Sequence, residues 1–225
     1  MVDTEIIALH GWAFDRHIWD NFEQRLPDTL HWVPWDRGYF HEPIDAEFSA
    51  AATRKVIITH SFGLHQLKTE WISQTDILVI ISGFRDFHPG TPQYRKRSKA
   101  IIASMQRELK NDPVAVLNKF YEQCYSPDDA PITFSTQNRW DNELLIKDLD
   151  DLNTAQLGKA ILSIPEVCIL HGTADHVVPH TKGRELFNYL GDNTSYYEIR
   201  NAGHSLPETH ATICSNFIEP ILFNR

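Results

Sequence analysis

Six short apolar runs recur along the chain, and most of them end in small or turn-forming residues. The runs are rich in Ile, Val and Leu with little polar alternation, which is typical of parallel strands buried on both faces. They are Glu5–Leu9, His31–Trp35, Lys55–Thr59, Asp76–Ser82, Glu166–Leu170 and Thr194–Ile199. The pattern therefore predicts a sheet of six strands.

Helix-like segments follow most of these strands. They cover about His17–Leu26, Phe62–Ser73, Thr181–Leu190 and Ser205–Leu222. Because strands and helices alternate, we expect the α/β class with a doubly wound, mostly parallel sheet.

The alternation is interrupted between Phe84 and Pro165. A long helical pattern covers Tyr94–Leu109, and Asp112-Pro113 is a good start for a second helix that runs to about Cys124. Further short helices are expected before the fifth strand. We therefore predict one domain over residues 1–225 with a helical insertion, residues 84–165, after the fourth strand. This insertion is called the cap below.

Composition agrees with a globular enzyme or binding protein. The chain has 225 residues, of which 42% are hydrophobic and 23% charged, and this balance argues against disorder. The formal net charge of −9 gives no reason to expect nucleic-acid binding.

The sequence also carries signals of compartment. Three cysteines, far apart, are typical of reduced thiols in a cytosolic protein. The first residues, Met1–Glu5, are acidic and lack the basic start and long apolar stretch of a signal peptide. No apolar run approaches the roughly 20 residues of a membrane helix. We expect a cytoplasmic protein without a membrane partner.

A candidate nucleophile lies where the third strand passes into a helix. The segment Thr59-His60-Ser61-Phe62-Gly63 has the strand–turn–helix context of a nucleophile elbow. Gly63 meets the need for a small residue after the nucleophile, whereas Thr59 stands where Gly is common. Taken alone, a serine in this place is more often a helix N-cap.

Two more residues complete a catalytic pattern. Asp175 follows the fifth strand and His204 follows the sixth, so the chain order is Ser61, Asp175, His204. Residues at the carboxyl ends of parallel strands meet at one edge of the sheet, where open α/β folds bind ligands. Alone, Asp175 is an Asx-turn residue and His204 a loop residue. Together they predict a Ser-His-Asp triad.

An acyl-transfer site also needs backbone N–H groups that hold a developing oxyanion. We expect these from Phe62, directly after Ser61, and from Trp12 in the His10-Gly11-Trp12 turn after the first strand. The alternative for this turn is an ordinary strand end.

A metal centre is the competing interpretation of the histidines near Asp175. His176 and His180 are four residues apart, but Pro179 between them argues against a shared helical face. We expect no metal and no cofactor.

These motifs resemble the α/β-hydrolase superfamily along nearly the whole chain. Within it, the sequence is most similar to the pimeloyl-[acyl-carrier protein] methyl ester esterases of biotin synthesis. The narrower resemblance rests on Trp12 directly after His-Gly, on Met105–Asp112 with Lys119-Phe120, and on the Leu145–Leu157 run.

The resemblance implies a serine carboxylesterase that releases methanol from an ester carried by acyl carrier protein. It also implies that Phe120 and Tyr121 contact the substrate. Phe84, Phe87 and Trp140 are further candidates for the lining of an acyl channel. The alternative is that these aromatic residues pack the cap onto the sheet, which is the favoured interpretation for Phe84 and Trp140. The alternatives are a general short-chain carboxylesterase or thioesterase, a lyase like those of the menaquinone pathway, and a non-catalytic binding module.

Charge changes sign within the cap. Tyr94–Lys110 contains six basic residues and one acidic residue, a net charge of +5 in a chain of −9. A solvated helix face is the usual explanation of such a run. Since acyl carrier protein is acidic, the resemblance implies docking through Arg95, Arg97 and Lys99, with Lys119 where a docking arginine is usual.

Overall fold

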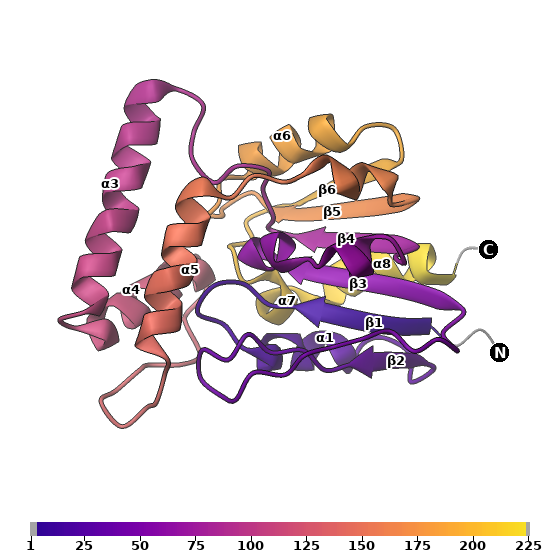
Figure 1. The fold of residues 1–225 in the computed structure, drawn as a ribbon, viewed down its shortest axis with the longest axis horizontal. Helices are drawn as coiled ribbons and strands as arrows, with labels where there is room; N and C mark the ends of the chain where they lie inside the picture. The colour runs from indigo at the N-terminus through magenta and orange to yellow at the C-terminus, as the bar shows by residue number, and fades with distance from the viewer. Residues whose placement is uncertain (1–3, 224–225) are drawn as a thin grey trace.

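One parallel sheet organises the computed structural model, which describes residues 4–223 (Figure 1). Its strands are β1 Thr4–Leu9, β2 Leu30–Val33, β3 Arg54–His60, β4 Ile77–Ile81, β5 Glu166–Gly172 and β6 Thr194–Ile199. Their order is β2-β1-β3-β4-β5-β6, and every neighbouring pair is parallel. All six predicted strands are therefore confirmed, with ends that shift by no more than two residues.

The sheet is buried on both faces, as its apolar runs predict. Successive residues of a strand face opposite sides, so Ile57 and Ile58 belong to two different hydrophobic cores. The core around Ile58 is covered by α1 Asp20–Glu23, α7 Leu206–Thr209 and α8 Ala211–Phe223. The core around Ile57 is covered by α2 Thr69–Ile72 and α6 His180–Leu190. Because all six strands are parallel, their carboxyl ends lie at one edge of the sheet.

Two predicted helices are wrong in their continuity. Instead of one helix over Phe62–Ser73, a 3₁₀ helix, η2 Ser61–Gln66, is followed by an extended link and then by α2. Contacts on both sides of the link explain the break. His65 bonds to the Phe84 carbonyl at 3.0 Å, and the Lys68 ammonium lies over the Trp71 ring while it binds Asp45. These tertiary contacts outweigh helix propensity.

The carboxyl-terminal segment predicted as one helix over Ser205–Leu222 is also divided. It forms α7 and α8, with a break at His210, whose φ of −128° is not helical. Earlier in the chain, the predicted helix at His17–Leu26 is a short 3₁₀ turn, η1 Arg16–Trp19, that continues into α1.

The cap lies beyond the carboxyl ends of the strands (Figure 1). Between β4 and β5 the chain forms α3 Pro92–Leu109, α4 Pro113–Tyr125, α5 Asn142–Thr154 and the 3₁₀ helix η3 Lys159–Ser163. Local sequence explains the start of α4, because Asp112 accepts the Ala115 N–H at 3.0 Å and Pro113 needs no partner. Of the three α-helices, α3 is the outermost (Figure 1).

Other features bear on the expected compartment. Cys124, Cys168 and Cys214 are buried free thiols. Within residues 4–223, none of the helices has the length and apolar character that a membrane crossing requires. Residues 1–3 of the amino-terminal segment discussed above lie outside the described part of the chain.

The His65 imidazole gives the fold a predicted pH dependence. Burial lowers the pKa of His65 to about 4, whereas the unfolded chain binds the same proton near pH 6.5. Acid therefore favours the unfolded state. We expect this group to remove about 2 to 3 kcal/mol from the free energy of unfolding between pH 6.5 and 4, and the loss should be complete about one pH unit below the folded pKa.

Urea denaturation at a series of pH values measures this effect. The control is His65→Gln, which keeps a donor for the Phe84 carbonyl but does not titrate. The wild-type protein should lose more stability than the variant as the pH falls. Parallel curves would contradict the assignment.

Candidate active site

Ser61 occupies a strained turn at the carboxyl end of β3. Its φ of +52° lies in the left-handed region, which non-glycine residues seldom adopt. The turn needs Gly63, since a Cβ atom there would lie 2.4 Å from the Leu9 carbonyl oxygen. Thr59 is compatible with the turn because its hydroxyl lies toward β4, 3.4 Å from the Val79 carbonyl oxygen. The local structure therefore has the geometry of a nucleophile elbow.

The structure brings the three predicted triad residues together. His204 Nε2 lies 2.9 Å from Ser61 Oγ, and His204 Nδ1 lies 2.7 Å from Asp175 Oδ2. All three side chains are buried, with Ser61 7% exposed. In this arrangement the imidazole can take the Ser61 proton while the carboxylate fixes its tautomer.

The other oxygen of Asp175 is held by the backbone. Its Oδ1 accepts the N–H groups of Val177 at 2.9 Å and Val178 at 2.8 Å. Burial would raise the pKa of Asp175, but His204 and His171 outweigh it and hold that pKa well below its usual range. The group is therefore a carboxylate at any pH at which the protein would work.

His204 is positioned through its backbone by residues that the sequence analysis did not assign. Its carbonyl oxygen accepts bonds from His60 Nε2–H at 3.1 Å and Ser82 Oγ at 3.0 Å. Burial lowers the pKa of His60 well below its usual value, so this ring is a neutral donor. The His204 N–H donates to the Cys124 carbonyl of α4 at 2.9 Å, which links the catalytic loop to the cap. The one sequence signal for the role of His60 was its position, as a polar residue directly before Ser61.

Trp12 and Phe62, the predicted oxyanion donors, line the same cavity as Ser61. Within residues 4–223, neither of their backbone N–H groups donates a hydrogen bond to another group. Both donors are therefore free to bind an oxyanion.

The cavity at Ser61 is apolar and has a volume of about 280 Å³. Its lining consists of Trp12, Ser61, Phe62, Phe84, Phe87, Ser98, Ile101, Ile102, Met105, Phe120, Gln123, Leu149, Leu152, His176 and Val177. None of these is Asp, Glu, Lys or Arg. Such a lining suits an uncharged acyl chain.

The two predicted substrate contacts separate in the structure. Phe120 lines the cavity, with its ring centroid 4.8 Å from that of Trp12. Tyr121 lies outside the lining: its hydroxyl donates to the Ala13 carbonyl at 2.8 Å, and its ring stacks on Phe14. Tyr121 therefore joins the cap to the loop after β1 and lies outside this cavity. Trp140 is also outside the lining.

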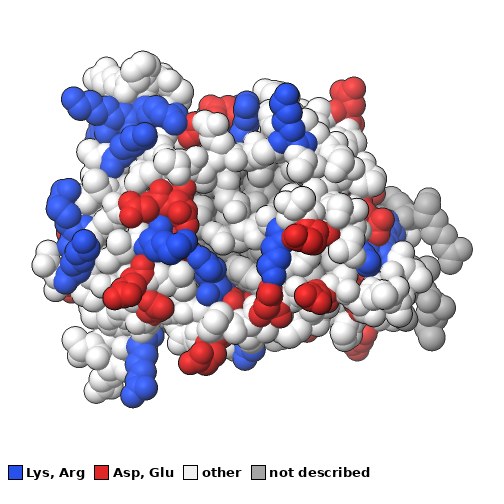
Figure 2. Space-filling view, in the orientation of Figure 1, with Lys and Arg blue, Asp and Glu red and all other residues white. Residues whose placement is uncertain are grey.

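The predicted docking residues differ in their surroundings. Arg95 is paired with Asp86 at 2.9 Å, whereas Arg97 and Lys99 on α3 and Lys119 on α4 are exposed. Figure 2 shows Lys and Arg side chains along the outer edge formed by α3, and a mixture of both signs over α5. The free positive charge of the cap is thus concentrated on α3.

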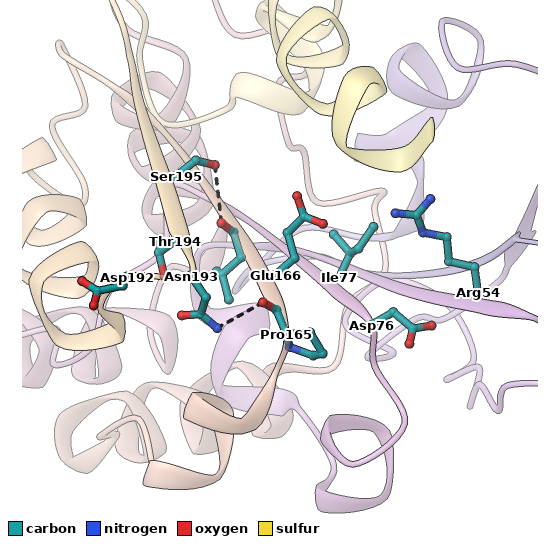
Figure 3. A pocket seen from close by; sticks show the side chains of 10 residues that line it. Arg54, Asp76, Ile77, Pro165, Glu166, Asp192, Asn193, Thr194 and Ser195 are labelled. Carbon is teal, nitrogen blue, oxygen red and sulfur yellow. Dashed lines mark hydrogen bonds between the residues drawn. The ribbon is translucent and has the colours of Figure 1, made fainter. Parts of the chain in front are cut away.

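A larger hollow lies at the opposite, amino-terminal edge of the sheet (Figure 3). Its polar groups are used by the fold itself. Arg54 donates to the carbonyls of Ile221 and Leu222, and Asn193 donates to those of Ile164 and Pro165. Because the hollow holds no nucleophile beside a base, the cavity at Ser61 is the better candidate.

In the described part of the chain, His, Cys, Asp and Glu do not form a group of three that could hold a metal ion. His176 precedes α6 and His180 begins it, so the two do not share a helical face.

Comparisons with known proteins agree with the fold. No family model and no curated protein matches the sequence. Similar solved structures include a bromoperoxidase from Bacillus anthracis, with a TM-score of 0.74 and 18% identity over 99% of this chain and 92% of that chain. An esterase from Exiguobacterium antarcticum has a TM-score of 0.76 and 14% identity, over 97% and 93%. MGS-M2, an α/β-hydrolase enzyme from a deep-sea metagenome, has a TM-score of 0.73 and 15% identity, over 99% and 90%. The chain therefore has the α/β-hydrolase fold.

Proposed function

We propose that the protein is a serine carboxylesterase. The observation that carries this proposal is the pair of hydrogen bonds that joins Ser61 to His204 and His204 to Asp175. The left-handed turn at Ser61, the free N–H groups of Trp12 and Phe62 and the apolar cavity support the same chemistry.

The proposed reaction has two halves. His204 Nε2 takes the proton of Ser61 as Oγ attacks the ester carbonyl, and the N–H groups of Trp12 and Phe62 hold the oxyanion. When the carbon–oxygen bond breaks, His204 returns the proton to the departing alkoxide, which leaves as the alcohol. Water then attacks the acyl-enzyme, with His204 again as the base, and releases the acid while Ser61 Oγ regains its proton.

The finer proposal is that the substrate is the methyl ester of pimeloyl-acyl carrier protein, hydrolysed in the cytoplasm for biotin synthesis. The sequence resemblance supports it. The cavity supports it too, because its lining contains no Asp, Glu, Lys or Arg and therefore suits the uncharged methyl ester end of the acyl chain. The exposed bases of α3 provide a surface for an acidic carrier protein. Comparing kcat/KM for the carrier-bound methyl ester with that for p-nitrophenyl esters and for acyl thioesters tests the substrate. A preference for free esters or thioesters would leave the esterase chemistry but reject the carrier.

Charge reversal on α3 tests the docking part of this proposal. Arg97→Glu should lower kcat/KM for the carrier-bound ester by roughly fivefold at low ionic strength, because the exposed guanidinium would attract the acidic carrier. The effect should shrink as salt is added. Turnover of a free methyl ester should not change.

The matched control is Lys159→Glu, which makes the same change of charge on η3, the exposed turn that leads into the amino-terminal end of β5. This variant should retain wild-type kcat/KM with the carrier-bound ester. Equal losses in both variants would mean that only net charge matters and would reject α3 as the docking surface.

A further inference from the structure

A buried acid on cap helix α5 has no role in the mechanism above. The side chain of Asp148 is fully buried and accepts three hydrogen bonds from the loop after β2. Arg37 donates through Nε and Nη2, both at 2.7 Å, and the Tyr39 hydroxyl donates at 2.6 Å. Lys147 is 3.6 Å away but exposed. Arg37, Tyr39 and Asp148 are called the clamp below.

The backbone of Arg37 connects the clamp to the oxyanion loop. Its N–H donates to His10 Nε2 at 3.0 Å, and His10 Nδ1 lies 3.0 Å from the Gly11 carbonyl oxygen. The His10 ring is buried, with its centroid 4.9 Å from that of Trp35 and 5.9 Å from that of Tyr39. His10 is thus held by the segment that carries the clamp, two residues before the Trp12 N–H.

The same helix holds Trp12 directly. The Trp12 indole N–H donates to the Leu145 carbonyl at 2.9 Å. Leu145 and Asp148 are three residues apart and therefore neighbours on one face of α5. Helix α5 contacts the oxyanion loop at Trp12 and, through the clamp, at His10.

We propose that Arg37 and Asp148 are positioning residues, whose ion pair seats α5 on the oxyanion loop and so aims the Trp12 N–H at the oxyanion. This inference rests on the proposed esterase function. A buried ion pair contributes little to stability. Two parallel hydrogen bonds between Arg37 and Asp148 nevertheless fix the orientation of α5 relative to the loop after β2. A small displacement of a catalytic donor has a large effect on rate, which gives such a link its importance.

A double-variant experiment separates positioning from stability. Asp148→Leu or Arg37→Met alone leaves a buried group without its partner and should lower Tm. The combined variant Arg37→Met/Asp148→Leu removes both charges and should regain part of that Tm, while the buried Tyr39 hydroxyl, which has lost its acceptor, accounts for the remaining loss. We expect its kcat to remain about 10- to 100-fold below wild type, with KM changed less than threefold. The inhibition constant of a trifluoromethyl ketone, whose adduct places an oxyanion in the same site, should rise by the same factor as kcat falls.

The control pair is Arg184 with Glu198, a second two-pronged ion pair, formed between α6 and β6 at 2.6 and 2.8 Å. Arg184→Met should leave kcat unchanged. Tyr39→Phe, which removes one donor to Asp148, gives a milder variant if the others do not fold, and kcat should fall severalfold.

Recovery of kcat together with Tm in the double variant, or a loss confined to KM, would overturn the positioning role alone. Absence of ester turnover and of fluorophosphonate labelling in the wild-type protein would overturn the proposed function and this inference with it.

Discussion

Replacing Ser61 by alanine is expected to lower kcat by about four to six orders of magnitude without unfolding the protein. The Ser61 hydroxyl is the atom that would form the acyl-enzyme, and its hydrogen bond goes to His204 Nε2. Alanine keeps the Cβ atom that the left-handed turn already accommodates. Steady-state turnover of a p-nitrophenyl ester, with circular dichroism to verify the fold, measures the effect.

Ser205 provides a matched control for this substitution. It is buried next to His204, and within residues 4–223 its hydroxyl has no hydrogen-bond partner. Ser205→Ala removes the same atoms close to the same site and should stay within about threefold of wild-type kcat. If Ser61→Ala retained turnover comparable to Ser205→Ala, Ser61 would not be the nucleophile.

Asp175→Asn should lower kcat by about 10⁴-fold, because the backbone around residue 175 determines which way the asparagine amide points. The N–H groups of Val177 and Val178 both donate to Oδ1, so an asparagine must place its carbonyl oxygen there. Its NH₂ group then faces His204 Nδ1 and donates to it. The imidazole proton is forced onto Nε2, where the ring can no longer accept the proton of Ser61.

The measurement is again ester turnover, with Asp192→Asn as the control. Asp192 is exposed in the turn before β6, so the same change of charge and size there should leave kcat unaltered. A loss of less than tenfold in Asp175→Asn would show that the carboxylate does not set the His204 tautomer.

The sheet was predictable because burial on both faces leaves a continuous apolar signature. Runs such as Ile77–Ile81 have no polar residue, and this composition is typical of a central parallel strand, which is covered on both faces. The triad residues could be predicted for a related reason. Ser61, Asp175 and His204 each follow a strand, and the parallel topology alone brings strand ends to one edge.

Features that depend on particular side-chain contacts were not visible in the sequence. Phe120 and Tyr121 are adjacent on α4 and lie about 100° apart around the helix, so only one faces the cavity. The bond between Arg37 and Asp148 joins residues 111 positions apart without any motif. The break between η2 and α2 likewise depends on distant partners of His65 and Lys68. Periodicity contains no information about such contacts.

Covalent labelling tests the central claim most directly. The folded protein should react with a fluorophosphonate at one site per chain, and mass mapping of its peptides should place the adduct on Ser61. The reaction should be lost in Ser61→Ala and slow in Asp175→Asn, because the hydroxyl must transfer its proton to His204. An adduct on another residue, or an unlabelled wild-type protein, would contradict the assignment of Ser61 as the nucleophile of a serine esterase.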